Sequence, residues 1–276
     1  MTVLDSIVAR APVFLLVVAR CLGLVLTLPL FSTRTISSVP KVALSAYMAF
    51  FISAHMSVQS GTFEAYRSFI SPEGNFSLDY VLVLVGEAMI GVTMGFFVSL
   101  IFASFSTAGQ FFAFQMGFSA AEAYDSLSQV ENPLMGQYLN LIAMLVFMQN
   151  HWFQTLFLGA LSTSFQAFNV FAVIENGEHF LRFMLSGLSL LFRNALVVAL
   201  PIMGTLFLLN VAMGVLSKAA PQMNLLSEGF PTMMLVSFFL ITALMPVLCN
   251  FFTESFSDGF KQLQLLFVRI GGGGIP

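Results

Sequence analysis

Residues 80–106 read YVLVLVGEAMIGVTMGFFVSLIFASFS, with Glu87 as the single charged side chain. A helix that crosses the hydrocarbon layer of a membrane needs roughly 20 consecutive, mostly apolar residues, and this stretch is longer than that. Water is a poor solvent for such a segment, because only one of its side chains is charged. The stretch therefore predicts a long helix embedded in a membrane.

Further apolar regions with few charges lie on both sides of this stretch. The longest, residues 134–174, has no formal charge but is interrupted by Gln149, Asn150 and His151, which predicts two helices joined in a tight hairpin. The sequence thus predicts an all-α membrane protein with six or seven apolar helices. The remaining regions are residues 11–31, 42–58, 183–216 and 230–252.

The composition of the whole chain agrees with a membrane protein. Of its 276 residues, 58% are hydrophobic and 8% are charged, whereas a soluble domain carries about 25% charged residues. The net charge of -3 comes from 10 basic and 13 acidic residues, scattered along the chain without a run of like charge. We therefore expect contact with membrane lipid and no binding of nucleic acid.

Residues 256–276 predict an amphipathic helix followed by a flexible tail. Apolar side chains recur at spacings of four and three, while charged and amide side chains fall elsewhere on the helical wheel. The glycine run at residues 271–274 is typical of a flexible segment. The apolar residues of the pattern are Phe256, Phe260, Leu263, Phe267 and Ile270.

Motifs of enzyme active sites are absent from the sequence. His55, His151 and His179 are isolated, and none begins the His-Glu-x-x-His pattern of metalloproteases. Residues 187–190 read Gly-Leu-Ser-Leu, as at some intramembrane serine proteases, but no histidine base follows residue 179. There is also no Gly-x-x-x-x-Gly-Lys phosphate-binding motif. We expect no enzymatic activity, no cofactor and no metal site.

Three charges lie inside apolar regions, at Arg20, Glu87 and Arg193. Each costs at least about 2.5 kcal/mol at the membrane centre unless it finds a partner or water. One interpretation is a secondary transporter of a small solute that uses Glu87 with Arg20 or Arg193. The other is a structural ion pair to a neighbouring subunit, which we favour because a relay normally needs more than one buried carboxylate and the sequence shows no clear internal repeat.

Glycines punctuate the stretch that contains Glu87. Gly91 and Gly95 have the Gly-x-x-x-Gly spacing that lets two helix backbones approach closely, and Gly86 lies about one further turn back. Small residues also reach this spacing by chance. The sequence therefore leaves open whether these glycines form a helix contact.

Residues 108–121 form a charge-free segment that is dense in phenylalanine. A plain lipid-facing helix is a poor fit, because Gln110 and Gln115 would face hydrocarbon. A loop or broken helix that lines a pore fits better, since bulky apolar side chains can close a channel by excluding water. The candidate gate or plug residues are Phe111, Phe112, Phe114, Gln115, Met116, Gly117 and Phe118.

Four blocks distributed along the chain match a known pattern. The most specific block is Ala219-Ala220-Pro221-Gln222-Met223-Asn224, and the match extends to about residue 260. With these blocks the chain resembles the FliR family of flagellar type III export-gate proteins, whose counterpart in virulence secretion is SctT. The blocks are Ala19-Arg20 with Pro29-Leu30-Phe31 and Pro40; Gly86-Glu87 with Gly91-Val92-Thr93-Met94-Gly95-Phe96; Gly109-Gln110 with Gln115-Met116-Gly117-Phe118; and Gly214 to Asn224 with Gly229-Phe230-Pro231.

The resemblance implies a core subunit of an export gate in the bacterial inner membrane, within the flagellar basal body. FliP-like and FliQ-like subunits would be its partners in a helical hetero-oligomer, with a FlhB-like docking subunit nearby, and unfolded flagellar proteins would pass through. Residues 1–255 would form one membrane-embedded domain. Within it, residues 1–182 would be FliP-like and residues 183–255 a FliQ-like hairpin, leaving residues 256–276 as the C-terminal helix and tail.

The resemblance also implies roles for two segments. Residues 111–118 would act as the plug, although the family commonly has a proline after the aspartate that follows this block, where this chain has Asp125-Ser126. The polar turn after the apolar region 183–216 would contact another export component, the docking subunit being the expected one. The residues of this partner loop are Lys218, Pro221, Gln222, Met223 and Asn224.

Overall fold

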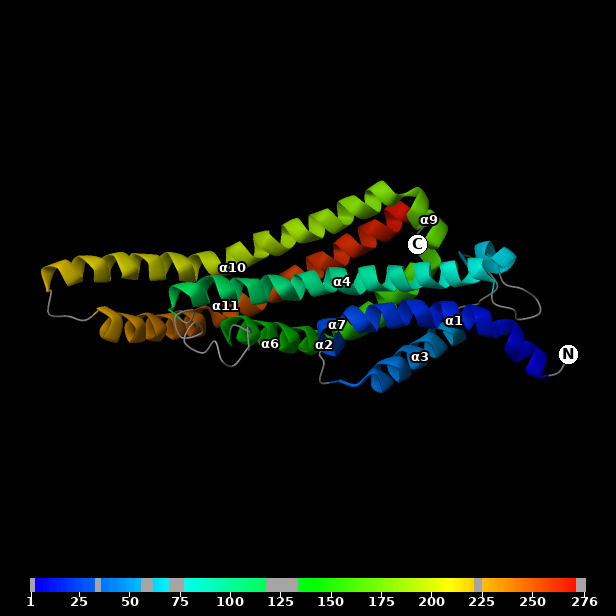
Figure 1. The fold of residues 1–276 in the computed structure, drawn as a ribbon, viewed down its shortest axis with the longest axis horizontal. Helices are drawn as coiled ribbons and strands as arrows, with labels where there is room; N and C mark the ends of the chain where they lie inside the picture. Colours follow the sequence, from blue (N-terminus) through cyan, green and yellow to red (C-terminus); the bar gives the residue numbers. More distant parts are fainter. Residues whose placement is uncertain are drawn as a thin grey trace. The chain divides into compact units, whose positions relative to one another are not determined.

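The computed structural model describes residues 3–32, 36–55, 62–69, 77–117, 134–220 and 225–271. Every regular element in these ranges is a helix, which confirms the all-α prediction (Figure 1). The elements are α1 (Val3–Thr27), α2 (Pro29–Ser32), α3 (Ser38–His55), the 3₁₀ helix η1 (Thr62–Phe69), α4 (Leu78–Gln115), α6 (Leu134–Gln149), α7 (Trp152–Gln154), the π-helix η2 (Thr155–Leu161), α8 (Ser162–Ala167), α9 (Val170–Glu175), α10 (Gly177–Ala219) and α11 (Leu225–Ile270).

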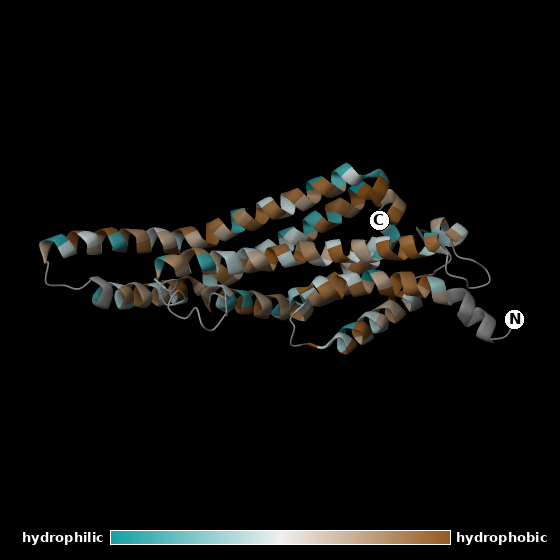
Figure 2. Cartoon of the chain, viewed as in Figure 1, coloured by the Kyte–Doolittle hydropathy of each residue, from teal (hydrophilic) through white to brown (hydrophobic). Residues whose placement is uncertain are grey.

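Three helices of the described residues are long and apolar enough to cross a membrane: Leu78–Gln115, Gly177–Ala219 and Glu228–Ile270. Only 44%, 22% and 22% of their most apolar windows are buried within the chain. Figure 2 shows hydrophobic residues along the length of all three. Surfaces of this kind need lipid or other subunits as cover, so the chain is a membrane protein.

Not every apolar helix of the described residues is long enough to cross a membrane. The apolar parts of α1 and α3 are short, Ala11–Thr27 and Ser38–Ala54. α6 and the Trp152–Ala167 segment together have the length and apolarity of one crossing, bent at a break. By length and composition, three crossings are available among the described helices, or four if this bent pair forms one. The predicted number of apolar helices is therefore not a number of crossings, because an apolar helix can be covered by protein as well as by lipid.

The interruption predicted at residues 149–151 is confirmed. α6 ends at Gln149, and His151 takes a left-handed backbone conformation with φ of 54° before α7 begins at Trp152. A non-glycine residue at positive φ cannot continue a right-handed helix, so the chain changes direction here. The chain makes a bend here rather than the tight hairpin of two crossings that the sequence suggested.

The chain divides into two compact units. Unit 1 comprises Met1–Ser99, His151–Gly187 and Ser257–Pro276, and unit 2 comprises Leu100–Asn150 and Leu188–Phe256. The core of unit 2 is a cluster of phenylalanine rings from α4, α6 and α11. The ring of Phe105 lies 4.0 Å from that of Phe252 and the ring of Phe147 lies 5.2 Å from that of Phe256, between centroids.

Within unit 2, α10 and α11 run antiparallel. Asn194 donates a hydrogen bond to Ser255 at 3.5 Å, while Gly229 lies beside the Met213 side chain nearer the loop that joins the two helices. Residues near the connection contact each other across the two helices, and so do residues far from it, which is the pattern of a helical hairpin. Figure 1 shows the two helices side by side.

The C-terminal amphipathic pattern lies on a helix, but its setting differs from the expected one. All five apolar residues from Phe256 to Ile270 are buried, and they belong to the continuous helix α11 rather than to a separate helix. In unit 1 the ring of Phe260 stacks on Trp152 at 5.1 Å, and the ring of Phe267 lies 5.4 Å from that of Phe168. The pattern therefore marks a core contact, and residues 272–276 lie outside the described residues.

Residues 108–115 are regular helix, so the expectation of a loop or broken helix is wrong for them. Gly109, within this stretch, packs against α6: a Cβ at Gly109 would lie 2.5 Å from the carbonyl oxygen of Met135. A glycine can remain in a helix when the space it frees is filled by another backbone. The helix ends at Gln115. Met116 and Gly117 then form a turn, and residues 118–133 lie outside the described part of the chain.

Candidate functional site

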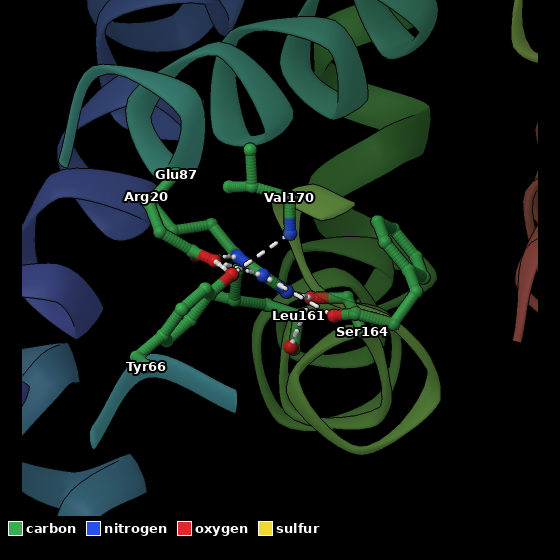
Figure 3. Close-up of polar contacts among 7 residues, drawn as sticks. Arg20, Tyr66, Glu87, Leu161, Ser164 and Val170 are labelled. Carbon is green, nitrogen blue, oxygen red and sulfur yellow. Dashed lines mark hydrogen bonds and ion pairs between the residues drawn. The ribbon is translucent and has the colours of Figure 1, made fainter. Parts of the chain in front are cut away.

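A buried ion pair joins α1 to α4 in unit 1 (Figure 3). Arg20 Nε donates to Glu87 Oε2 at 2.6 Å, and its terminal nitrogen donates to Glu87 Oε1 at 2.9 Å. The two side chains are 1% and 0% exposed. This is the two-pronged arginine–carboxylate geometry, the strongest arrangement available to such a pair.

Glycines bring the two helices close enough for this pair. A Cβ at Gly91, one turn after Glu87, would lie 2.0 Å from the carbonyl oxygen of Arg20. A Cβ at Gly23 on α1 would lie 2.2 Å from the carbonyl oxygen of Ala88, and Gly95 likewise faces the backbone of α1. Any side chain at these positions would push the helices apart.

Tyr66 adds a third group to the ion pair. It comes from η1, donates its hydroxyl proton to Glu87 Oε1 at 2.6 Å, and accepts a hydrogen bond from the backbone N–H of Val170 at 2.8 Å. Burial raises the pKa of Tyr66, and the adjacent Glu87 carboxylate raises it further. The phenol is therefore a neutral donor to the carboxylate at ordinary pH.

The far side of the Arg20 guanidinium contacts the segment around α8. Arg20 donates to Ser164 Oγ at 3.0 Å and to the carbonyl oxygen of Phe168 at 3.4 Å. Its central carbon lies 4.2 Å from the ring centroid of Phe165 and 5.5 Å from that of Phe168. Stacking on aromatic faces is favourable for a guanidinium removed from water. The charged group thus finds its partners within the same chain, and the expectation of an ion pair to a neighbouring subunit is wrong for Arg20 and Glu87.

The polar contacts meet at a gap between two helices. α8 ends before Phe168, and Phe168 and Asn169 are both extended, with φ of -156° and -120°. Asn169 caps α9 by accepting from the N–H of Ala172 at 2.9 Å. The carbonyl of Phe168 and the N–H of Val170 are left without helical partners by the gap, and Arg20 and Tyr66 supply them.

The structure assembles only part of the charge set suggested by sequence. Arg20 and Glu87 meet, but Arg193 belongs to unit 2, where its side chain is exposed. Tyr66, Ser164 and Phe168 were not predicted as site residues. No sequence pattern marks them, since each is an ordinary residue whose role comes from tertiary contact.

The candidate gate residues occupy the end of α4 in unit 2. Phe112 and Met116 are fully buried, while Phe114 is 74% exposed and Phe111 and Gln115 are half-buried. Gln115 Oε1 is buried within the chain without a hydrogen-bond partner among the described residues. Phe118 lies outside the described residues. The segment thus combines anchored side chains with one aromatic ring that protrudes.

The remaining candidates are less informative. Lys218 is exposed in the last turn of α10, and Pro221, Gln222, Met223 and Asn224 lie outside the described residues. Gly86 does not face α1, since a Cβ there would lie 2.6 Å from Cγ1 of Val170. Among the residues that the structure describes, no three His, Cys, Asp or Glu side chains are grouped as a metal ion would require.

The sequence matches the profile of a known protein family. The profile of the family described as "Bacterial export proteins, family 1" matches residues 11–259. The chain belongs to this family. The matched range of this bacterial export protein includes Arg20, Tyr66, Glu87, Ser164 and Phe168, and therefore the whole buried cluster.

Relatives of this export-family member carry the name "Flagellar biosynthetic protein FliR". The protein of that name from Bacillus subtilis (strain 168) is 28% identical over 272 residues, covering 97% of this chain and 99% of the relative. The one from Escherichia coli (strain K12) is 30% identical over 244 residues, 88% of each chain. The one from Aquifex aeolicus (strain VF5) is 24% identical over 196 residues, 69% of this chain and 72% of the relative.

Proposed function

We propose that the chain is a non-enzymatic core subunit of the flagellar type III export gate. It forms and closes the channel through which unfolded flagellar proteins cross the bacterial inner membrane at the flagellar basal body. The observation that carries this proposal is the family match over residues 11–259, together with relatives named as flagellar biosynthetic proteins along almost the whole chain.

The exposed apolar surface of α10 supports a role inside a larger assembly. Large apolar side chains are exposed along most of its length, many of them at the spacings of three and four that bring side chains together on a helix surface. We propose that FliP-like and FliQ-like subunits cover this surface together with membrane lipid, and that a FlhB-like subunit docks at the loop after Lys218. The exposed residues include Leu181, Leu185, Leu188, Phe192, Leu196, Phe207, Val211 and Val215.

The end of α4 supports the closing role. Phe114 protrudes from the helix, while Phe112 and Met116 hold the same turn in the core of unit 2. A bulky apolar ring on an anchored helix end can block ions by excluding water and still move aside for a passing chain. We therefore propose residues 111–117 as the described part of the plug.

The geometry of Glu87 argues against the secondary-transporter alternative. Its Oε1 accepts from Arg20 and Tyr66 and its Oε2 accepts from Arg20, and its side chain has no exposed surface. A coupling site must open to substrate or water from each side of the membrane in turn. The saturated pair instead has the character of a structural contact.

Co-expression with the neighbouring export subunits tests the proposal. Membranes are solubilised in mild detergent, the chain is purified by a tag, and native mass measurement determines what accompanies it. The proposal expects a hetero-oligomer of defined mass, with the chain poorly extracted when it is expressed alone. A monodisperse single chain or homo-oligomer that takes up a small solute in liposomes would support the transporter instead.

A further inference from the structure

The start of α9 is held by contacts with two other elements of unit 1. The side chain of Val170 fills the space that a Cβ at Gly86 would need, which docks α9 on α4. The ring of Phe171 lies 5.8 Å from that of Tyr66 and stacks on that of Phe69 at 5.5 Å, which docks α9 on η1. The first two residues of α9 are therefore placed by packing on both sides.

Side-chain packing does not provide hydrogen-bond partners for the backbone groups at the gap before α9. The extended residues Phe168 and Asn169 remove the helical hydrogen bonds that would otherwise use the Phe168 carbonyl and the Val170 N–H. A buried backbone group without a partner is strongly disfavoured, and it is disfavoured more in an apolar interior. Polar side chains must therefore reach the gap.

We infer that Arg20, Glu87 and Tyr66 act as a positioning cluster that fixes the gap between α8 and α9. Arg20 supplies the donor for the Phe168 carbonyl, and Tyr66 supplies the acceptor for the Val170 N–H. Glu87 holds both groups in place, since it accepts from each of them. The ion pair thus sets the direction in which the chain leaves α8 and enters α9.

A positioning role requires polar side chains at residues 20, 66 and 87, whereas a role in packing α1 against α4 does not. The two roles can therefore be distinguished by apolar replacements. A buried ion pair can often be replaced by apolar residues of similar volume without loss of stability. Apolar residues at 20 and 87 would preserve the contact between α1 and α4, but they would offer nothing to the Phe168 carbonyl and would leave Tyr66 without its acceptor. A positioning role therefore predicts that loss of order is concentrated at the gap between α8 and α9.

Hydrogen exchange of the full chain, in the membrane assembly in which it is expressed, tests this inference. Tyr66→Phe removes the acceptor for the Val170 N–H while keeping the ring that packs on Phe171. We expect exchange in peptides covering residues 168–175 to rise roughly tenfold or more, the change for losing a hydrogen bond within a charged network. Tyr80→Phe is the matched control, because Tyr80 also donates to a buried backbone carbonyl, that of Pro12, and should leave these peptides unchanged.

The double variant Arg20→Met with Glu87→Leu tests the cluster without leaving one charge of the ion pair buried and unpaired. We expect its thermal midpoint to fall less than that of Arg20→Met alone, which leaves the Glu87 charge buried without its partner, while exchange at residues 168–175 rises. Removing the exposed pair of Arg182 and Glu178, which are both 74% exposed, should change neither. The inference is overturned if both the Tyr66 variant and the double variant exchange at residues 168–175 as slowly as the parent, or if exchange rises equally throughout the chain.

Discussion

The ring of Phe230 occupies the space in which a side chain on Gly117 would stand. A Cβ at Gly117 would lie 2.3 Å from Cδ1 and 2.4 Å from Cε1 of that ring. Gly117 also has φ of 82°, a conformation that disfavours residues with a side chain. The first part of α11 therefore rests on the turn that follows α4, at the end of the described part of the proposed plug.

Replacing Phe230 with alanine is expected to loosen the end of α4 while the assembly still forms. The ring is only partly buried, so its loss opens a smaller cavity than loss of a core phenylalanine would. Cells or bilayers containing the variant should leak small ions, and amides of residues 112–117 should exchange faster. Phe239→Ala, on an exposed position of the same helix, is the control. An ion-tight variant with unchanged exchange would show that Phe230 does not support the plug.

The helical fold could be predicted because long apolar stretches can be recognised in the sequence. The stretch around Glu87 lies within a single long helix, and the break near His151 follows from three polar residues in an otherwise apolar region. The number of crossings could not be predicted from the same signal. An apolar face records that a helix is covered, and it does not record whether lipid or protein covers it.

The candidate site could be predicted only in part for a related reason. A charge in an apolar region is conspicuous, so Arg20 and Glu87 stood out, and so did Arg193, which the structure leaves exposed. Their partners come from chain segments far away in sequence: Tyr66 lies 21 residues from Glu87, and Ser164 lies 144 residues from Arg20. The end of α4 was misjudged because Gln110 and Gln115 look unsuited to a helix in an apolar region, whereas the helix carries both of them.

Replacing Gly91 with alanine should separate α1 from α4 and weaken the buried ion pair. The new methyl group would lie 2.0 Å from the carbonyl oxygen of Arg20, and overpacking of this kind typically costs about 1 to 3 kcal/mol. We expect a lower unfolding midpoint and faster exchange at residues 168–175. Gly204→Ala is the matched control, because a Cβ at Gly204 meets nothing within 4 Å and alanine favours the helix. Equal midpoints for the two variants would contradict the close contact.

Stability should fall at alkaline pH through Tyr66. Its pKa is raised in the folded chain, by burial first and by Glu87 second, so the folded state holds the phenolic proton more tightly than the unfolded state. The stabilisation is complete below the unfolded pKa of about 10 and is lost as pH rises above it, with a limiting slope of about 1.4 kcal/mol per pH unit. Unfolding midpoints measured across this range should fall less steeply for Tyr66→Phe. The exposed Tyr47 provides the control variant, Tyr47→Phe, and identical slopes for the parent and Tyr66→Phe would contradict the prediction.

The two phenylalanines of the proposed plug should respond differently to truncation. Phe112 has no exposed surface, and Phe114 is 74% exposed. Phe112→Ala leaves a cavity in the core of unit 2, at a cost of about 3 to 5 kcal/mol, and should lower the yield of assembled gate. Phe114→Ala leaves no such cavity, so assembly should be normal, yet removal of the protruding ring should let water and ions enter the constriction.

Conductance of the assembled complex in a planar bilayer measures the second effect, and native mass measurement of the same preparation measures the first. We expect a conducting, fully assembled complex for Phe114→Ala and a poorly assembled one for Phe112→Ala. Leu145→Ala, an exposed apolar position on α6, controls for loss of apolar surface alone. A Phe114 variant that assembles normally and remains as ion-tight as the parent would exclude this ring from the closed gate. The ring is exposed within its own chain, so a normally assembled variant tests its role in the gate without a change in the core.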